Sequence, residues 1–300
     1  MPGMAPGEQV INEIHTLDLA IGYAVTERLG ITLDLPLVFG RRTTREEHMG
    51  MMDFSQPQYT TRAHGIGDLR LTGDYWLWNP SEHPHGNVSV GLGLKLPTGA
   101  DDKRDNFTTP GGIVDRPVDP SIQPGDGGVG FIVQVQGFRQ LIGHLSLYGN
   151  AMYMLNPRED NGVRSFSMKP LDANGEAVHR DHVNSVTDQY LARLGLNYVL
   201  WPQAGLSLSL GGRIEGIPVR DLAGGDGGFR RPGYTISIEP GVSWVQGRHQ
   251  LAVTAPVAVE RNRQRSLAER AYRDDPNEML RIYPASFADW NLFASYSYRF

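Results

Sequence analysis

The chain ends on FADWNLFASYSYRF, residues 287–300, and the alternation in this stretch decides the fold that the sequence predicts. Successive side chains of an extended strand point to opposite sides, so this strand has one apolar, aromatic face and one polar face. A chain that stops on Phe at the end of such a strand is typical of a β-barrel whose outer surface contacts lipid. The apolar face carries Ala288, Trp290, Leu292, Ala294, Tyr296, Tyr298 and Phe300, and the polar face carries Asp289, Asn291, Ser295, Ser297 and Arg299.

Ten further stretches of the chain show the same alternation of apolar and polar side chains. These stretches are 8 to 14 residues long, which suits a tilted membrane strand of about 9 to 11 residues better than an average soluble strand of about 5 or 6. A soluble sandwich would be built on shorter strands. The ten stretches are residues 15–25, 31–39, 65–78, 88–96, 129–136, 145–153, 190–200, 206–215, 234–244 and 251–260.

Short turns and long polar loops alternate between these stretches, as in outer-membrane barrels with periplasmic turns and extracellular loops. The sequence therefore predicts an all-β fold, an antiparallel up-and-down transmembrane β-barrel with eleven strands in this chain, forming one domain over residues 1–300. The alternative is a large soluble antiparallel barrel. The turns are residues 27–30, 79–86, 142–144, 202–205 and 246–248, and the loops are residues 41–63, 97–126, 156–187, 218–232 and 261–284.

Composition excludes several classes of protein. The chain has no cysteine, so it has neither a disulfide framework nor a thiolate site. Its net charge is −5 and it has no block of basic residues, so we expect no nucleic-acid partner. The first ten residues, MPGMAPGEQV, lack the basic and apolar regions of a signal peptide. Either the protein is cytosolic or the chain begins after its true start.

Four stretches resemble one family of Gram-negative outer-membrane β-barrels, the proteins labelled as transporters of the MetA pathway of phenol degradation. They are VINEIHTLDLAIGYAVTERLGITLDLPLV (residues 10–38), GIGDLRL (residues 65–71), GLGLKLPTG (residues 91–99) and the closing YSYRF. The resemblance implies a barrel in the bacterial outer membrane that passes small, aromatic or hydrophobic molecules. It supplies no catalytic residues, and no cofactor is expected.

The chain departs from this family at its front, because related proteins carry a signal peptide and one more strand before VINEIHT. Bacterial single-chain barrels normally have an even number of strands. The first and last strands predicted here run in the same direction, so they could not pair in antiparallel fashion. We expect twelve strands in the complete protein. The eleven strands of this chain should leave an unpaired edge or a parallel seam.

Charged side chains on the polar faces of the strands are the candidate site, because these faces would line the lumen. Eight acids and five bases make this lining mixed in sign and slightly negative. One interpretation is cross-strand ion pairing, which lines any polar barrel interior. The other is a selectivity surface for a polar or weakly cationic solute. The candidates are Asp18, Asp34, Asp68, Arg70, Asp74, Lys95, Arg193, Arg213, Glu215, Glu239, Glu260, Asp289 and Arg299.

Other motifs are explained without a site. His83 and His85 flank a proline in a predicted turn, so no metal site is expected there. Two GDGG stretches, residues 125–128 and 225–228, lack the later acidic ligand of a calcium loop and suit flexible loops. A hydrolase would need Ser, His and carboxylate groups gathered at one strand end, and no GxSxG motif is present. The available loop residues are Asp181, His182 and Asp188, or Asp101, Asp102 and Asp105.

The sequence predicts a passive channel or transporter for small molecules in the bacterial outer membrane, and not an enzyme. The alternatives are a barrel-borne hydrolase that uses loop Asp and His residues, and a structural barrel with a plugged lumen. The expected partners are outer-membrane lipid, an unidentified small solute, and the barrel-assembly machinery, which would recognise the terminal strand ending at Phe300.

Overall fold

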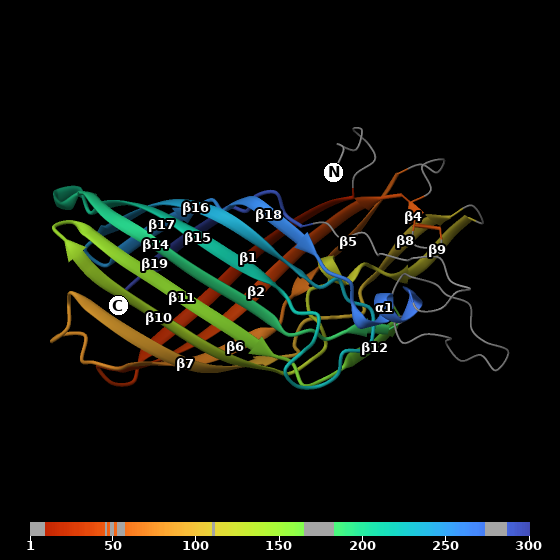
Figure 1. Cartoon of the computed structure of the whole chain (residues 1–300), viewed down its shortest axis with the longest axis horizontal. Coiled ribbons are helices and arrows are strands. Elements are labelled where there is room, and N and C mark those ends of the chain that lie inside the picture. Colours follow the sequence, from red (N-terminus) through yellow and green to blue (C-terminus); the bar gives the residue numbers. More distant parts are fainter. Residues whose placement is uncertain are drawn as a thin grey trace.

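A computed structural model describes residues 10–45, 47–48, 51–52, 58–109, 112–164, 183–273 and 287–300. The chain forms one large antiparallel sheet whose neighbouring strands follow each other in sequence. The sheet is curled into a half-barrel with tilted strands, and β2 passes on the far side of β11 (Figure 1). This confirms the predicted all-β, antiparallel, up-and-down architecture.

The sheet contains thirteen labelled strands, but the chain crosses it only eleven times, and we call each crossing a pass. Strands β5 and β6 together form one interrupted pass, and β17 and β18 form another. The predicted number of strands is therefore confirmed. Strands β1 and β19 stand at the two ends of the pairing order, and among the described residues no ladder joins them. The strands are β1 (Ile11–Ala24), β2 (Leu29–Thr44), β5 (Tyr59–Ile66), β6 (Leu69–Trp76), β7 (Gly86–Leu96), β10 (Gly130–Ile142), β11 (Leu145–Leu155), β14 (Gln189–Trp201), β15 (Leu206–Ile217), β16 (Gly233–Gln246), β17 (His249–Thr254), β18 (Val257–Arg263) and β19 (Phe293–Tyr298).

The outer face of the sheet is apolar and the inner face is polar, which is the reverse of the arrangement in a soluble protein. On the outer face, large apolar side chains are exposed, for example Leu92 (70%) and Leu194 (61%). On the inner face, Ser89 and Glu239 are buried. Among the described residues, 18 polar or charged side chains are buried against 8 hydrophobic ones, so the interior of the molecule is polar.

The third pass of the sheet contains a β-bulge that the sequence pattern did not reveal. Leu37 pairs with Ile66, and Asp34 pairs with Arg70. Between these two pairs the chain advances by three residues in β2 but by four residues from β5 to β6. The extra residue lies at Gly67 and Asp68, between β5 and β6. Because one extra residue changes which side chains face inward, Thr61 and Ala63 lie on the inner face together with Arg70.

The strands also extend further than predicted at the long-loop end. Strand β2 continues to Thr44 and β5 begins at Tyr59, inside the predicted loop 41–63. The terminal strand is shorter than predicted, since β19 covers only Phe293–Tyr298 and pairs with β17 alone. The tenth pass is interrupted at Ala255 and Pro256, and a proline cannot donate a ladder hydrogen bond.

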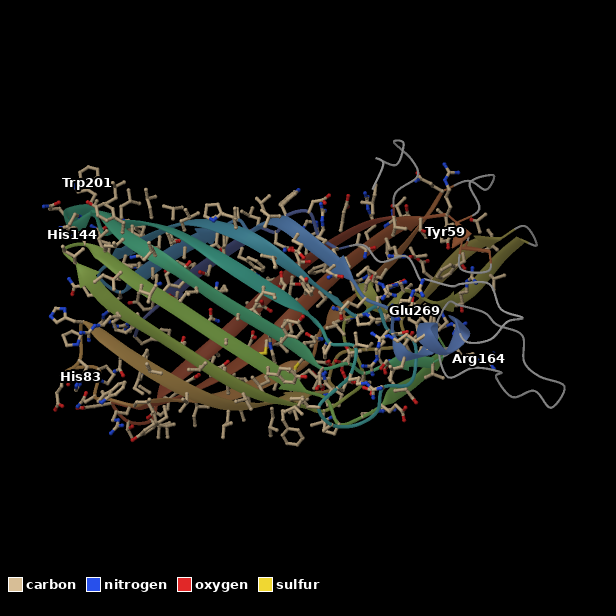
Figure 2. All side chains as sticks on the ribbon, in the orientation of Figure 1. Tyr59, His83, His144, Arg164, Trp201 and Glu269 are labelled. Carbon is tan, nitrogen blue, oxygen red and sulfur yellow. The ribbon has the colours of Figure 1, made fainter. Side chains whose placement is uncertain are left out.

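The long loops carry secondary structure of their own, gathered at one end of the sheet, and the short turns lie at the other end (Figure 1). Figure 2 shows His83, His144 and Trp201 at the short-turn end and Tyr59, Arg164 and Glu269 at the long-loop end. Helix α1 begins with a capping box, in which Ser266 and Glu269 exchange side-chain to backbone hydrogen bonds. The loop elements are β3 (Glu47–His48), β4 (Met51–Met52), β8 (Arg104–Thr109), β9 (Gly112–Pro117), the 3-10 turn η1 (Pro120–Ile122), β12 (Asp160–Arg164), β13 (Val183–Ser185) and α1 (Leu267–Arg273).

Among the described residues, no helix has the length and apolar character needed to cross a membrane.

Candidate functional site

Four charged side chains form a ladder on the inner face of β14, β15 and β16. We call Arg193, Arg213, Glu215 and Glu239 the arginine–glutamate ladder. Arg193 and Arg213 are directly paired across β14 and β15, which alone would place two like charges side by side. Glu239, which is 2% exposed, lies between them, with Oε1 at 3.1 Å from Arg193 Nη1 and Oε2 at 3.6 Å from Arg213 Nη1.

The outer members of the ladder complete its charge balance. Arg213 Nη2 lies 2.6 Å from Glu215 Oε2, and Arg193 Nε donates to Asn150 Oδ1 at 2.7 Å. Two guanidinium groups therefore face two carboxylates, and the ladder is formally neutral. Its ends are accessible from the lumen side, since the side chains of Arg193 and Glu215 are 33% and 31% exposed.

A second group of charges lies on the opposite half of the strand order, on β1, β2 and β6. Arg70 Nη2 lies 2.5 Å from Asp34 Oδ2 and 3.5 Å from Asp18 Oδ1. Asp74, on the same face of β6, accepts a hydrogen bond of 2.7 Å from Gln134 Nε2. Two carboxylates thus flank one guanidinium, and a third lies further along β6, so these four side chains carry a formal charge of −2.

Lys95 ends the polar face of β7 near the long loops. Its ammonium group is paired with Asp126 and lies 3.7 Å from Asp68 Oδ2. Asp68 also accepts hydrogen bonds from the backbone N–H groups of Gly99 (2.9 Å) and Asp126 (3.2 Å). The β-bulge at Gly67 and Asp68 thus presents a carboxylate that holds both ends of the loop between β7 and β10.

The structure places most of the predicted lumen residues together on the inner face. These are Asp18, Asp34, Asp68, Arg70, Asp74, Lys95, Arg193, Arg213, Glu215 and Glu239.

Of the other three predicted residues, Asp289 and Arg299 lie just outside β19, and Glu260 lies on the opposite side of the sheet. Glu260 pairs with Ile236 and accepts a hydrogen bond from the Tyr234 hydroxyl, so it lies on the outer face. The physical reason is a register shift between Ile236 and Ser237, which reverses the alternation in β18. Asp289 precedes β19, is 78% exposed and pairs with Arg261.

Aromatic side chains add to the inner face, and most of them escaped the sequence analysis. The rings of Trp76 and Phe138 meet edge to face at 6.3 Å, and the Arg213 guanidinium lies 5.0 Å from the Phe293 ring centroid. Tyr148 lies across two glycines, because a Cβ on Gly195 or Gly211 would come within 2.7 Å of its hydroxyl. The alternation in residues 65–78 places Trp76 on the polar face, and continuing the alternation of β10 by two residues places Phe138 there as well.

The histidines and the GDGG stretches serve as structural groups in the described residues. His85 Nδ1 is hydrogen-bonded to Gln140, and the His83 ring lies 6.1 Å from that of Trp78. Within the described ranges, no group of three or more His, Asp or Glu side chains could hold a metal ion. The acids of the two GDGG stretches are engaged, Asp126 with Lys95 and Asp226 with Arg220. Of the hydrolase candidates, Asp181 and His182 lie outside the described residues.

Asp188 belongs to a buried network at the mouth of the sheet. Its carboxylate accepts hydrogen bonds from the Tyr153 hydroxyl (2.8 Å), the Asn156 N–H (2.7 Å) and the Leu222 N–H (2.8 Å). Nearby, fully buried Arg230 pairs with Asp221 at 2.8 Å. These contacts join two long loops to each other and to β11, so Asp188 acts here as an anchor of the loops.

A curled antiparallel sheet with an apolar outside and a charged inside defines the architecture of an outer-membrane β-barrel. Among solved structures, the chain is similar to the crystal structure of an outer membrane channel from Pseudomonas putida F1. The two share 16% sequence identity with a TM-score of 0.53, over 85% of this chain and 79% of that chain. No protein-family model matches the chain, and no curated protein matches it. At this level of identity the likeness concerns the fold.

Proposed function

We propose that this protein is a channel of the bacterial outer membrane through which small molecules pass passively. The observation that carries the proposal is the inverted polarity of the sheet, whose outer face exposes leucine and valine and whose inner face buries charge. Removing an exposed leucine-sized side chain from water stabilises by about 1.5–3 kcal/mol. Lipid contact would provide this stabilisation along every strand. The similarity in fold to an outer membrane channel supports the proposal.

Aromatic residues near both ends of the outer face fit the two interfaces of a membrane. On β14, Tyr190 and Tyr198 are eight residues apart, which is about 27 Å along a strand. With a tilt of about 40° their separation along the membrane normal is about 20 Å, close to the apolar band of about 25 Å in such barrels. Trp201 lies beyond Tyr198, at the short-turn end (Figure 2).

Small aromatic or hydrophobic molecules, including weakly cationic ones, are the solutes we propose. The inner face offers the rings of Trp76, Phe138 and Phe293 for stacking. The excess of carboxylates around Arg70 would favour a positive charge. Membership of the phenol-degradation transporter family, and a place in that pathway, are the narrower form of this proposal.

Reconstitution of the purified protein in planar lipid bilayers tests the channel function. We expect single-channel conductance with a weak preference for cations, and swelling of liposomes in the presence of small neutral solutes. A correctly assembled barrel that gives neither conductance nor swelling would contradict the proposal. The Leu155→Ile protein, altered at the end of β11, is a suitable control for handling and reconstitution.

A barrel with a plugged lumen is the second candidate, and the buried loop contacts at the mouth favour it. Asp119 and Asp188 are both buried there and hold loop segments in place. The same bilayer experiment separates the two functions, because a plugged barrel would assemble but stay silent. We expect no hydrolase activity. His85 and His249 are hydrogen-bonded to Gln140 and Tyr296, and not to a serine or a carboxylate.

A further inference from the structure

One loop segment runs along the inner face of the sheet. We call residues 118–126, which contain η1, the inner strap. Ile122 is completely buried and packs with Val118 and with Ala63 of β5. It lies so close to β2 that a Cβ on Gly40 would come within 2.7 Å of the Ile122 Cβ. Gly40 and Ala63 are directly paired, so the strap rests on the inner face of two neighbouring strands.

The base of the inner strap is held by the β-bulge. Asp68 accepts hydrogen bonds from the N–H groups of Gly99 and Asp126, which stand at the two ends of the loop. The Thr98 hydroxyl donates to the carbonyl oxygen of Gly67 at 2.9 Å. Pro124 packs against Gly67, where a Cβ would lie 3.2 Å from the Pro124 carbonyl oxygen. The bulge therefore holds the two ends of the loop that contains the strap, and Asp126 is also the last residue of the strap.

The tip of the inner strap is held by Asp119, which is 3% exposed. Its two carboxylate oxygens accept hydrogen bonds from Arg231 Nη1 (2.9 Å) and Nη2 (2.7 Å), and Oδ2 lies 3.4 Å from Arg42 Nε. A bidentate pair of this kind fixes position as well as charge. Next to it, Asn12 of β1 donates a hydrogen bond of 3.1 Å to the Ser121 hydroxyl.

These contacts come from two distant parts of the sheet. Arg42 lies near the end of β2, the second pass, and Arg231 lies two residues before β16, the ninth pass. One carboxylate on the strap thus ties both sides of the half-barrel together at the long-loop end. The Asp119 carboxylate is the counter-ion of both arginines, so removing its charge would leave two buried guanidinium groups without this counter-ion.

We propose that the inner strap is a built-in constriction of the lumen and that Asp119 is the positioning residue that determines the largest solute admitted. The proposal rests on the proposed channel function. The strap occupies space on the inner face that solute would otherwise use, and Asp119 holds it at a fixed distance from both walls. The solute class it selects is therefore defined by size, and the ladder and the aromatic rings act further along the lumen.

The Asp119→Asn variant tests this proposal, because it keeps the side-chain volume and removes the charge. We expect its single-channel conductance to rise by about twofold or more, and larger neutral solutes to cause liposome swelling, since conductance follows the open cross-section. The matched control is Asp115→Asn, which breaks the exposed Arg104–Asp115 pair in the same loop. It should conduct like the wild type. Unchanged conductance and size limit in an assembled Asp119→Asn barrel would overturn the proposal.

A cysteine at position 121 gives an independent test that keeps Asp119. The chain has no cysteine and Ser121 is exposed, so Ser121→Cys offers a single thiol. We expect reaction with a cationic methanethiosulfonate reagent to lower cation preference, and reaction with an anionic one to raise it. Failure of the assembled barrel to react, or complete modification without any change in conductance or selectivity, would overturn the proposal.

The outcomes also separate the strap from the channel function. If the wild type conducts and neither the Asp119→Asn nor the labelled Ser121→Cys protein differs from it, the strap proposal fails and the channel function stands. If the wild type is silent and Asp119→Asn conducts, the channel function fails for the wild type and the strap proposal is supported, because the strap then closes the lumen as in the plugged barrel. If all assembled proteins are silent, the channel function fails and the strap proposal fails with it.

Discussion

At the scale of single residues, the inner face is organised by carboxylates that each serve two basic or backbone partners. Glu239 lies between Arg193 and Arg213, Asp68 holds Gly99 and Asp126, and Asp119 pairs with two arginines. Such groups cost desolvation energy when buried, and removing one member leaves its partners uncompensated. The charges of the inner face are therefore coupled in small sets rather than acting singly.

Glu239→Gln is the most direct test of the ladder. It changes the ladder from neutral to a formal charge of +1 and leaves two neighbouring guanidinium groups with one carboxylate. We expect the free energy of unfolding to fall by about 3 kcal/mol and the reversal potential to shift toward anion preference. Urea unfolding and bilayer recordings measure the two effects. The control Glu215→Gln removes a partly exposed partner, so its loss of stability should stay below about 1 kcal/mol. If the two variants lost the same stability, Glu239 would not be the central group of the ladder.

The pH dependence of the strap follows from the environment of Asp119. Burial by itself would raise the pKa of this carboxyl, but Arg231 and Arg42 outweigh burial and hold the pKa well below its ordinary value. An acid with a depressed pKa contributes stability above its unfolded pKa and loses it only as pH falls toward the folded value. We expect wild-type conductance to stay constant between about pH 5 and pH 8. An increase in conductance as the pH is lowered through about 6 would show that a group other than this carboxylate holds the strap.

At the scale of elements, three irregularities in the sheet decide how the site is built. The bulge at Gly67 turns Asp68 toward the ends of the loop between β7 and β10. The register shift beside Ser237 turns Glu260 outward, and the break at Pro256 separates β17 from β18. A bulge redirects side chains because the period of a strand is two residues. The same irregularities that bend the sheet also determine on which face a charged side chain lies.

The terminal strand provides a prediction at this scale. Tyr296, Tyr298 and His249 stack on the outer face at the short-turn end, and Phe300 continues the row with its ring 5.2 Å from that of Tyr298. We propose that this end is what the barrel-assembly machinery recognises. Deletion of Phe300 should reduce the amount of assembled barrel in the outer membrane severalfold, measured by heat-modifiable mobility in gels. Equal assembly of the deletion and wild-type proteins would contradict this recognition.

At the scale of the whole molecule, the fold places polar groups inside and apolar groups outside, and the described loop elements lie at one end. Such an arrangement is stable only where the outer surface meets an apolar medium. Buried polar groups then need partners from distant strands and loops, and the inner strap and the network around Asp188 supply them. If the strap is the constriction proposed above, the stability of the barrel and the width of its lumen depend on the same contacts.

The polarity of the two faces can be tested with two variants, one that places an arginine on the outer face and one that places an arginine on the inner face. Leu194 lies on the outer face of β14, midway between Tyr190 and Tyr198, and is 61% exposed. Leu194→Arg should lower the stability of the assembled barrel by about 2–4 kcal/mol, the cost of an arginine near the bilayer midplane. Gln136→Arg places the same charge on the inner face and should assemble normally while reducing cation preference. If both variants assemble equally well, the outer face does not contact lipid.

The sequence by itself determined the class of fold, the number of strands and most of the inner charged residues. Strict alternation tells which side chains share a face, and the lengths of turns and loops tell which strands are neighbours. The tertiary structure alone decided the outward position of Glu260 and the path of the inner strap. The physical reason is that one extra residue in a bulge reverses the alternation, and that Asp119 meets Arg231, 112 positions later in the sequence, only when the chain between them has folded into a curved sheet.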